Sequence, residues 1–118
     1  MIIDIGNTVA KMVAFRGDEP VDEVRAEDGM LSGLDAFVQK HRFERGIVGS
    51  VRNLTEGEEE ALSRLPFPLL RFTHDTPVPI TSRYRTPETL GSDRLAAVIG
   101  ASSLRPGKDL LIIDAGTC

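Results

Sequence analysis

Short apolar segments, separated by turns that contain glycine and charged residues, recur along the chain. Strands are predicted where apolar residues alternate with polar ones or form short runs, and helices where apolar residues recur three and four positions apart. The predicted strands cover residues 1–5, 9–15, 21–26, 46–51 and 67–72, of which residues 21–26 alternate least clearly. A turn is predicted at residues 17–20, between the second and third strands.

Three helices are predicted between and after these strands. Ser32 is the candidate N-cap of the first helix, and Thr55 with Glu58 forms the capping box of the second. The third helix runs over residues 92–104 and follows an irregular, proline-containing segment at 73–87. Strands followed by alternating helices and strands predict an α/β fold in which helices flank a mixed sheet of about five strands.

Composition narrows the class of protein. The 118 residues suffice for one core, and 14 basic against 18 acidic residues give a net charge of −4. An acidic balance disfavours a nucleic-acid surface, which is normally basic. The single cysteine excludes an internal disulfide, and no signal region or membrane-length apolar run is visible. We therefore expect a cytoplasmic protein that binds neither nucleic acid nor membrane.

One short signature occurs twice. Asp4-Ile5-Gly6-Asn7-Thr8 follows an apolar strand, and Asp114-Ala115-Gly116-Thr117 follows the apolar run 110–113, which is predicted to be a strand too. The order suits a phosphate–metal site, because the carboxylate can hold a hydrated cation, the glycine lets backbone N–H groups approach phosphate, and the hydroxyl adds a hydrogen bond. A plain hairpin turn uses the same residues and stays an open alternative. The two copies, about one domain length apart, predict two related lobes that face one nucleotide.

A third motif lies between the two signatures. It reads Tyr-x-Thr-Pro-x-x-Leu-Gly-x-Asp-Arg over Tyr84 to Arg94, and the first signature extends to Asp-x-Gly-Asn-Thr-x-x-Lys at Lys11. The three motifs, in this order and over the whole chain, closely resemble the N-terminal half of bacterial type III pantothenate kinases. The resemblance implies an actin-like (ribonuclease H-like) lobe of the acetate and sugar kinase and heat-shock ATPase superfamily. Residues 1–108 would form that lobe, and residues 109–118 the first strand and phosphate loop of a truncated second lobe.

The resemblance also implies an activity. Enzymes of this kind phosphorylate pantothenate to 4′-phosphopantothenate, the first step of coenzyme A biosynthesis, as homodimers that use ATP with Mg²⁺ and a monovalent cation, K⁺ or NH₄⁺. Because ATP lies between two lobes in this fold, the chain by itself is expected to be inactive. Two alternatives stay open: a non-catalytic regulatory accessory protein of the same fold, or another small-molecule kinase of the superfold.

Asp93 and Arg94 are the candidate catalytic and specificity residues. Asp93 lies at a helix start, which favours a negative charge, and could orient a hydroxyl and accept its proton late in phosphoryl transfer. The resemblance implies this role of general base, although Ser-Asp at a helix start is often only a cap. Arg94 carries a planar fork that can grip the pantothenate carboxylate.

The remaining site residues come from the resemblance. The residues expected to contact ATP and its phosphates are Asp4, Ile5, Gly6, Asn7, Thr8, Val9, Ala10, Lys11 and Thr117. The residues expected to bind the substrate are Tyr84, Gly91, Ser92, Asp93 and Arg94. Asp114 is expected to coordinate the monovalent cation, and Asp4 to hold magnesium through water.

Overall fold

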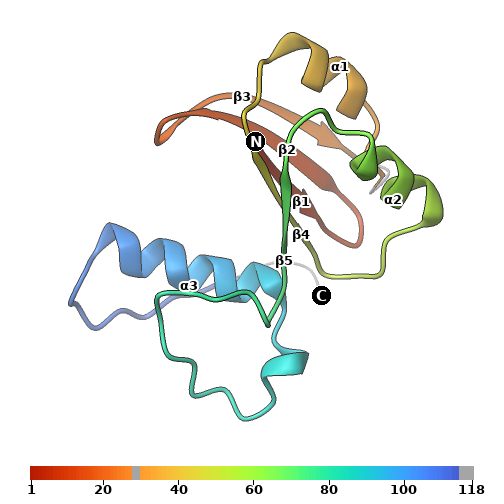
Figure 1. Cartoon of the computed structure of the whole chain (residues 1–118). Coiled ribbons are helices and arrows are strands. Elements are labelled where there is room, and N and C mark those ends of the chain that lie inside the picture. Colours follow the sequence, from red (N-terminus) through yellow and green to blue (C-terminus); the bar gives the residue numbers. More distant parts are fainter. Residues whose placement is uncertain (28–29, 115–118) are drawn as a thin grey trace. The chain divides into compact units, whose positions relative to one another are not determined.

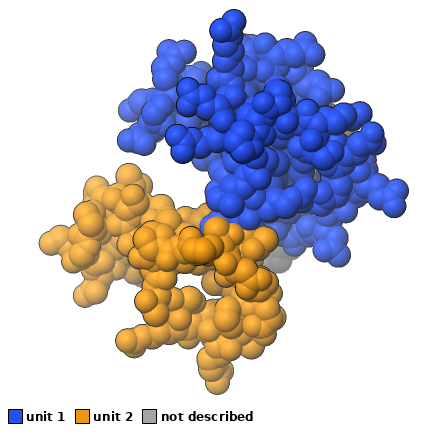
Figure 2. All heavy atoms as spheres, viewed as in Figure 1, with its two compact units in different colours: residues 1–72 blue, residues 73–118 orange. Residues whose placement is uncertain are grey.

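A computed structural model describes residues 1–27 and 30–114 of the chain. The chain divides into two compact units, unit 1 over residues 1–72 and unit 2 over residues 73–118, which Figure 2 distinguishes by colour. Unit 1 contains every strand that the structure describes, and unit 2 contains the longest described helix. Among the described residues, no helix is long and apolar enough to cross a membrane.

Unit 1 is built on a five-stranded mixed sheet with the strand order β3-β2-β1-β4-β5 (Figure 1). β1 and β2 pair antiparallel, as do β2 and β3, whereas β4 runs parallel to β1 and β5 parallel to β4. The strands are β1 (Ile2–Ile5), β2 (Ala10–Arg16), β3 (Glu19–Ala26), β4 (Gly46–Ser50) and β5 (Leu69–Phe72). The predicted mixed sheet of about five strands is confirmed, including the weakly alternating third strand.

Alternation along the strands places one face of the sheet in the core. On β1, Ile3 and Ile5 are fully buried, whereas Ile2 and Asp4 are exposed. The register sets Ile3 opposite Met12 on one side and Val48 on the other, so the buried residues of three neighbouring strands meet on the same face. The exposed β1 residues lie on the opposite face.

Two helices cover the buried face of the sheet. α1 (Leu34–Lys40) contributes Leu34 and Phe37 to the core cluster that contains Ile3 and Ile5, and α2 (Glu56–Ser63) contributes Leu62. Figure 1 shows both helices on the same side of the sheet. The other face of the sheet, which carries Asp4, is therefore not the one that these two helices cover.

The predicted start of α2 is confirmed, whereas the predicted N-cap of α1 is wrong. α2 begins with the predicted capping box, in which Thr55 accepts a hydrogen bond from the Glu58 backbone N–H and the Glu58 carboxylate accepts one from the Thr55 backbone N–H. The predicted N-cap Ser32 is wrong, because the N-cap of α1 is Gly33 with φ 86°. That left-handed backbone suits glycine, which lacks the Cβ that would clash there.

The described part of unit 2 contains one long helix, α3 (Ser92–Leu104), whose bounds match the prediction. The preceding segment is irregular as predicted, apart from the short 3₁₀ turn η1 (Pro87–Thr89). Residues 110–113 form no strand among the described residues: none of them joins a sheet, and Leu111 and Ile113 are 87% and 79% exposed. Their place as the first strand of a second lobe stays a prediction. An apolar run becomes a strand only when it pairs with a neighbour, and no described segment pairs with this one.

Candidate functional site

The first signature forms a tight turn between β1 and β2. The backbone N–H of Gly6 donates to the carbonyl of Val9 over 3.0 Å, and Asn7 and Thr8 between them are exposed. The backbone of this segment is thus the hairpin turn that the alternative interpretation described. Phosphate binding at its exposed residues stays a prediction.

Gly6 is the position in this turn where a side chain has no room. A Cβ on Gly6 would lie 2.9 Å from the carbonyl oxygen of Val9, closer than real Cβ contacts, and that oxygen accepts the hydrogen bond that closes the turn. Glycine is therefore required here by close packing of the backbone rather than by a positive φ.

Gly6→Ala is expected to destabilise the chain by about 1 kcal/mol, because the added methyl group overpacks the turn and must displace the Val9 carbonyl. Chemical denaturation of both proteins measures this difference. Gly57→Ala is the matched control, since a Cβ at Gly57 in α2 meets nothing within 4 Å. Equal midpoints for wild type and Gly6→Ala would contradict the prediction.

Asp4 and Lys11 lie directly opposite each other on the antiparallel β1–β2 pair. Asp4 is exposed and Lys11 half-buried, and both lie on the face of the sheet away from α1 and α2. By contrast, the side chains of Ile5 and Ala10 are fully buried, so these two predicted ATP contacts could act only through their backbone. The structure thus brings together one carboxylate and one ammonium group beside the exposed turn.

Asp4 offers the kind of ligand that magnesium uses. Mg²⁺ keeps several waters and is commonly held by one or two carboxylates together with substrate phosphates. The described residues contain no cluster of three or more potential ligands that could form an all-protein metal cage. A single carboxylate next to a turn that is predicted to bind phosphate fits the chemistry of a magnesium–nucleotide complex.

An ion pair between half-buried Arg52 and buried Glu58 contacts the turn. Arg52 Nη2 and Nη1 donate to Glu58 Oε1 and Oε2 over 2.7 and 3.0 Å, and Arg52 Nε donates to the Gly6 carbonyl over 3.3 Å. The Glu58 side chain is only 4% exposed. The guanidinium of Arg52 therefore connects α2 to the first signature.

The charges of this pair stabilise each other. The pKa of Glu58 is lowered to about 2, first by hydrogen bonds from Arg52 and then by those from the backbone and side chain of Thr55, against the opposing effect of burial. The hydrogen bonds with Glu58 in turn raise the pKa of Arg52. Glu58 is thus ionised, and Arg52 charged, throughout the neutral range.

Sequence reasoning missed Arg52. One signal was available, because Arg52 follows a predicted buried strand, and the carboxyl ends of neighbouring parallel strands meet at one edge of a sheet, where ligand sites commonly form. Using it required the knowledge that β4 lies beside β1 in parallel, which is a matter of topology.

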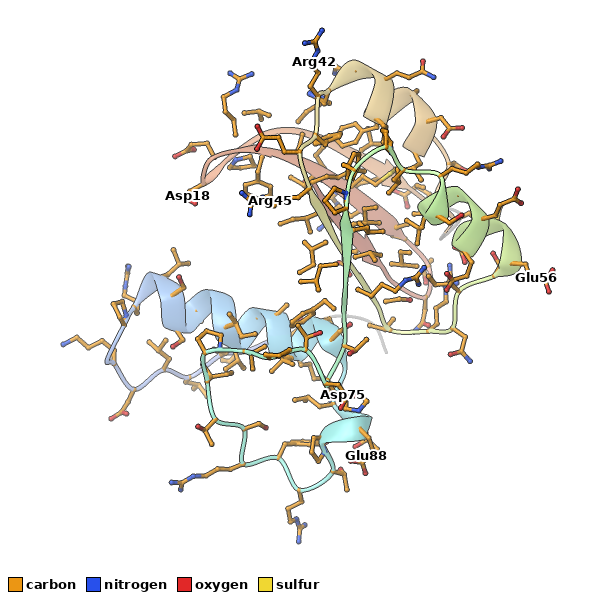
Figure 3. All side chains as sticks on the ribbon, in the orientation of Figure 1. Asp18, Arg42, Arg45, Glu56, Asp75 and Glu88 are labelled. Carbon is orange, nitrogen blue, oxygen red and sulfur yellow. The ribbon has the colours of Figure 1, made fainter. Side chains whose placement is uncertain are left out.

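A cavity of about 700 Å³ lies at the other end of β1. It is lined by Met1, by residues of the β2–β3 hairpin and by residues 41–45, which include Arg42 and Arg45, both labelled in Figure 3. No predicted site residue lines this cavity. The first signature instead forms an exposed turn at the carboxyl end of β1.

The third motif lies in unit 2, around the start of α3. Gly91 occupies the N-cap position without a side-chain hydrogen bond, and Asp93 and Arg94 are exposed in the first turn. Ser92 and Asp93 therefore lie in the first turn of α3 rather than at its N-cap. The missing side chain of Gly91 leaves space that the Asp93 carboxylate occupies.

The other predicted site residues that the structure describes, Tyr84 and Asp114, are exposed. Tyr84 is 47% exposed in the irregular segment ahead of η1. Asp114 is exposed, and Thr117 lies outside the described residues. The structure thus groups Asp4 with Lys11 in unit 1, and Gly91 to Arg94 along one helix start in unit 2.

Comparisons with known proteins agree with these motifs. The sequence profile of the family described as type III pantothenate kinase matches residues 1–118. The chain is 48% identical over its full length to a type III pantothenate kinase of Phocaeicola vulgatus and 46% to one of Bacteroides fragilis, in each case covering 49% of the relative. It is 41% identical over 99% of its length to one of Porphyromonas gingivalis, covering 48% of that protein. The chain spans about half the length of these curated relatives, and it belongs to the type III pantothenate kinase family.

Proposed function

We propose that this chain supplies the phosphate-binding turn and the catalytic base of an enzyme that transfers the γ-phosphoryl group of ATP to pantothenate. The observation that carries the proposal is the match of the type III pantothenate kinase profile to the entire chain. Within that match, every motif residue needed for the chemistry is present, from Asp4 to Asp114. The product is 4′-phosphopantothenate, and we assign the enzyme to the cytoplasm and to a homodimer.

In this proposal the first signature binds the nucleotide phosphates. Phosphoryl transfer is catalysed mainly by positioning and by charge stabilisation. The exposed turn at Asn7 and Thr8 offers backbone N–H groups and a hydroxyl, and Lys11 adds a positive charge on the neighbouring strand. Mg²⁺, held through water by Asp4, would neutralise phosphate charge. Asp114 would coordinate the monovalent cation, and Thr117 would contact ATP.

The third motif acts on pantothenate. The exposed Asp93 carboxylate orients the primary hydroxyl and accepts its proton as the new P–O bond forms, because an alcohol is too weak an acid to ionise beforehand. Arg94, one residue further along α3, grips the carboxylate with two parallel hydrogen bonds. Tyr84, Gly91 and Ser92 complete the substrate site.

The test uses an extended protein, defined as this chain followed by the C-terminal half of the Phocaeicola vulgatus relative. Coupled detection of ADP should show release that depends on pantothenate. With acetate or simple sugars, the substrates of other kinases of the superfold, in place of pantothenate, the extended protein should release no ADP. A folded extended protein that binds ATP and shows no pantothenate-dependent release would contradict the proposal.

Arg94→Lys in the extended protein should raise KM for pantothenate and leave KM for ATP nearly unchanged, because lysine keeps the charge and loses the planar fork. Initial rates at varied concentrations of each substrate measure both constants. Arg105→Lys, an exposed change at the far end of α3, is the control. If the wild-type protein has the same KM for an amide analogue of pantothenate as for the acid, Arg94 does not bind the substrate carboxylate.

A further inference from the structure

The carbonyl oxygen of Gly6, in the turn proposed to bind phosphate, is contacted by Arg52, which lies between β4 and α2. Arg52 Nε donates to this oxygen over 3.3 Å, across 46 positions of sequence. The contact forms because β4 runs parallel to β1, so that Arg52 emerges beside Gly6 at the same edge of the sheet. The Val51 backbone N–H donates to the Ile5 carbonyl over 3.1 Å and continues the pairing to this point.

Glu58 fixes the orientation of Arg52. Both terminal nitrogens of the guanidinium donate to the two carboxylate oxygens of Glu58, and Arg52 Nη1 also donates to the Asn53 carbonyl over 3.1 Å. The carboxylate itself is anchored by the backbone N–H and hydroxyl of Thr55, over 2.8 and 3.0 Å. Because a guanidinium is planar and rigid, this bidentate grip directs Nε to the Gly6 carbonyl.

The direction of that carbonyl decides where the next amide points. The described residues contain no cis peptide bond, so the bond between Gly6 and Asn7 is trans. In a trans peptide the C=O and N–H groups point in opposite directions. When Arg52 holds the Gly6 oxygen, the N–H of Asn7 must point away from Arg52.

We propose that Arg52, oriented by Glu58, is a positioning residue that sets the Gly6–Asn7 peptide so that the Asn7 N–H is presented to an ATP phosphate. The inference rests on the proposed function and adds to it a residue outside the three motifs. Arg52 acts through the backbone of the turn, since its own donors are directed at Glu58, Asn53 and Gly6.

Two substitutions separate the positioning contact from the charge pair. In glutamine, Nε2 occupies the same place along the side chain as arginine Nε, so Arg52→Gln keeps a donor for the Gly6 carbonyl and loses the charge. In lysine a methylene group stands at that place, so Arg52→Lys keeps the charge and loses the donor. Arg71→Lys is the matched control, because Arg71 forms an exposed bidentate pair with Glu59 on α2.

The extended protein carrying each substitution is measured in two ways. We expect Arg52→Lys to raise KM for ATP by about tenfold with little change in KM for pantothenate, as a misplaced donor would. In wild type, the amide NMR signal of Asn7 should shift on addition of Mg²⁺ with a non-hydrolysable ATP analogue, and Arg52→Lys should reduce that shift. Arg52→Gln should retain more of the shift than Arg52→Lys, although it loses more stability.

The outcomes are distinguishable. If the charge pair alone matters, Arg52→Lys retains the Asn7 shift and Arg52→Gln loses it, which overturns the proposal. The proposal is also overturned if the Asn7 amide signal of the wild-type protein does not shift when the ATP analogue is added. If the wild-type protein shows the shift and releases no ADP with pantothenate, the proposed function fails and the positioning role stands. Should Arg52→Gln not fold, Arg52→Lys against Arg71→Lys still decides: equal shifts in both refute the proposal.

Discussion

Asp93→Asn in the extended protein is expected to lower turnover by about 10²- to 10⁴-fold, the usual cost of removing a positioned general base. Asparagine keeps the shape of the side chain and its place in the first turn of α3, but it cannot accept the proton of the pantothenate hydroxyl. KM for either substrate should change far less than turnover. Steady-state ADP release at saturating ATP and pantothenate measures the loss.

The control for this experiment is a second exposed aspartate in unit 2. The Asp75 side chain, labelled in Figure 3, is 85% exposed and lies in the irregular segment ahead of η1. Asp75→Asn should leave turnover within about twofold of wild type, as surface changes usually do. Thermal denaturation should give similar midpoints for both variants. Wild-type turnover in a folded Asp93→Asn protein would remove Asp93 from the mechanism.

Glu58→Gln is expected to lower the free energy of unfolding at pH 7 by about 3 kcal/mol, the lower end of the cost of breaking a buried ion pair. The Glu58 side chain is 4% exposed and that of Arg52 is 24% exposed. Glutamine at position 58 carries no charge, so Arg52 loses its bidentate carboxylate partner. Chemical denaturation of this 118-residue chain measures the difference. Glu59→Gln, which breaks the half-exposed ion pair between Glu59 on α2 and Arg71 on β5, should cost under about 1 kcal/mol.

The difference between wild type and Glu58→Gln should also depend on pH. The pKa of Glu58 is lowered from 4.5 to about 2 by folding, so its contribution to stability is fully present above pH 4.5 and is lost as the pH falls towards 2. The two proteins should therefore converge in stability between these values. A difference that stays constant from pH 7 to pH 2.5 would show that the Glu58 charge is not its source.

Local sequence patterns were sufficient for most of unit 1 and for α3. Strand β1 was predictable because Met1 to Ile5 form a short, mainly apolar run. Which of its apolar residues are buried was not, since Ile3 and Ile5 lie in the core whereas Ile2 is exposed. The capping box at Thr55 was predictable because its hydrogen bonds join residues three apart. The start of α1 was not predictable in this way. Whether Ser32 or Gly33 is the N-cap depends on a backbone dihedral angle, which residue type only biases.

Long-range pairing decided the rest. The run Leu110 to Ile113 has the composition of a buried strand, yet the chain offers it no described partner, and composition cannot supply one. Arg52 reads in the sequence as an ordinary charged residue after a strand, and its contact with Gly6 exists only because β4 docks parallel to β1. The sequence by itself determined the family, the motif residues and the local elements, since each depends on neighbours in the chain. Tertiary structure alone decided that Arg52 contacts the turn at Gly6, because that contact joins segments 46 positions apart.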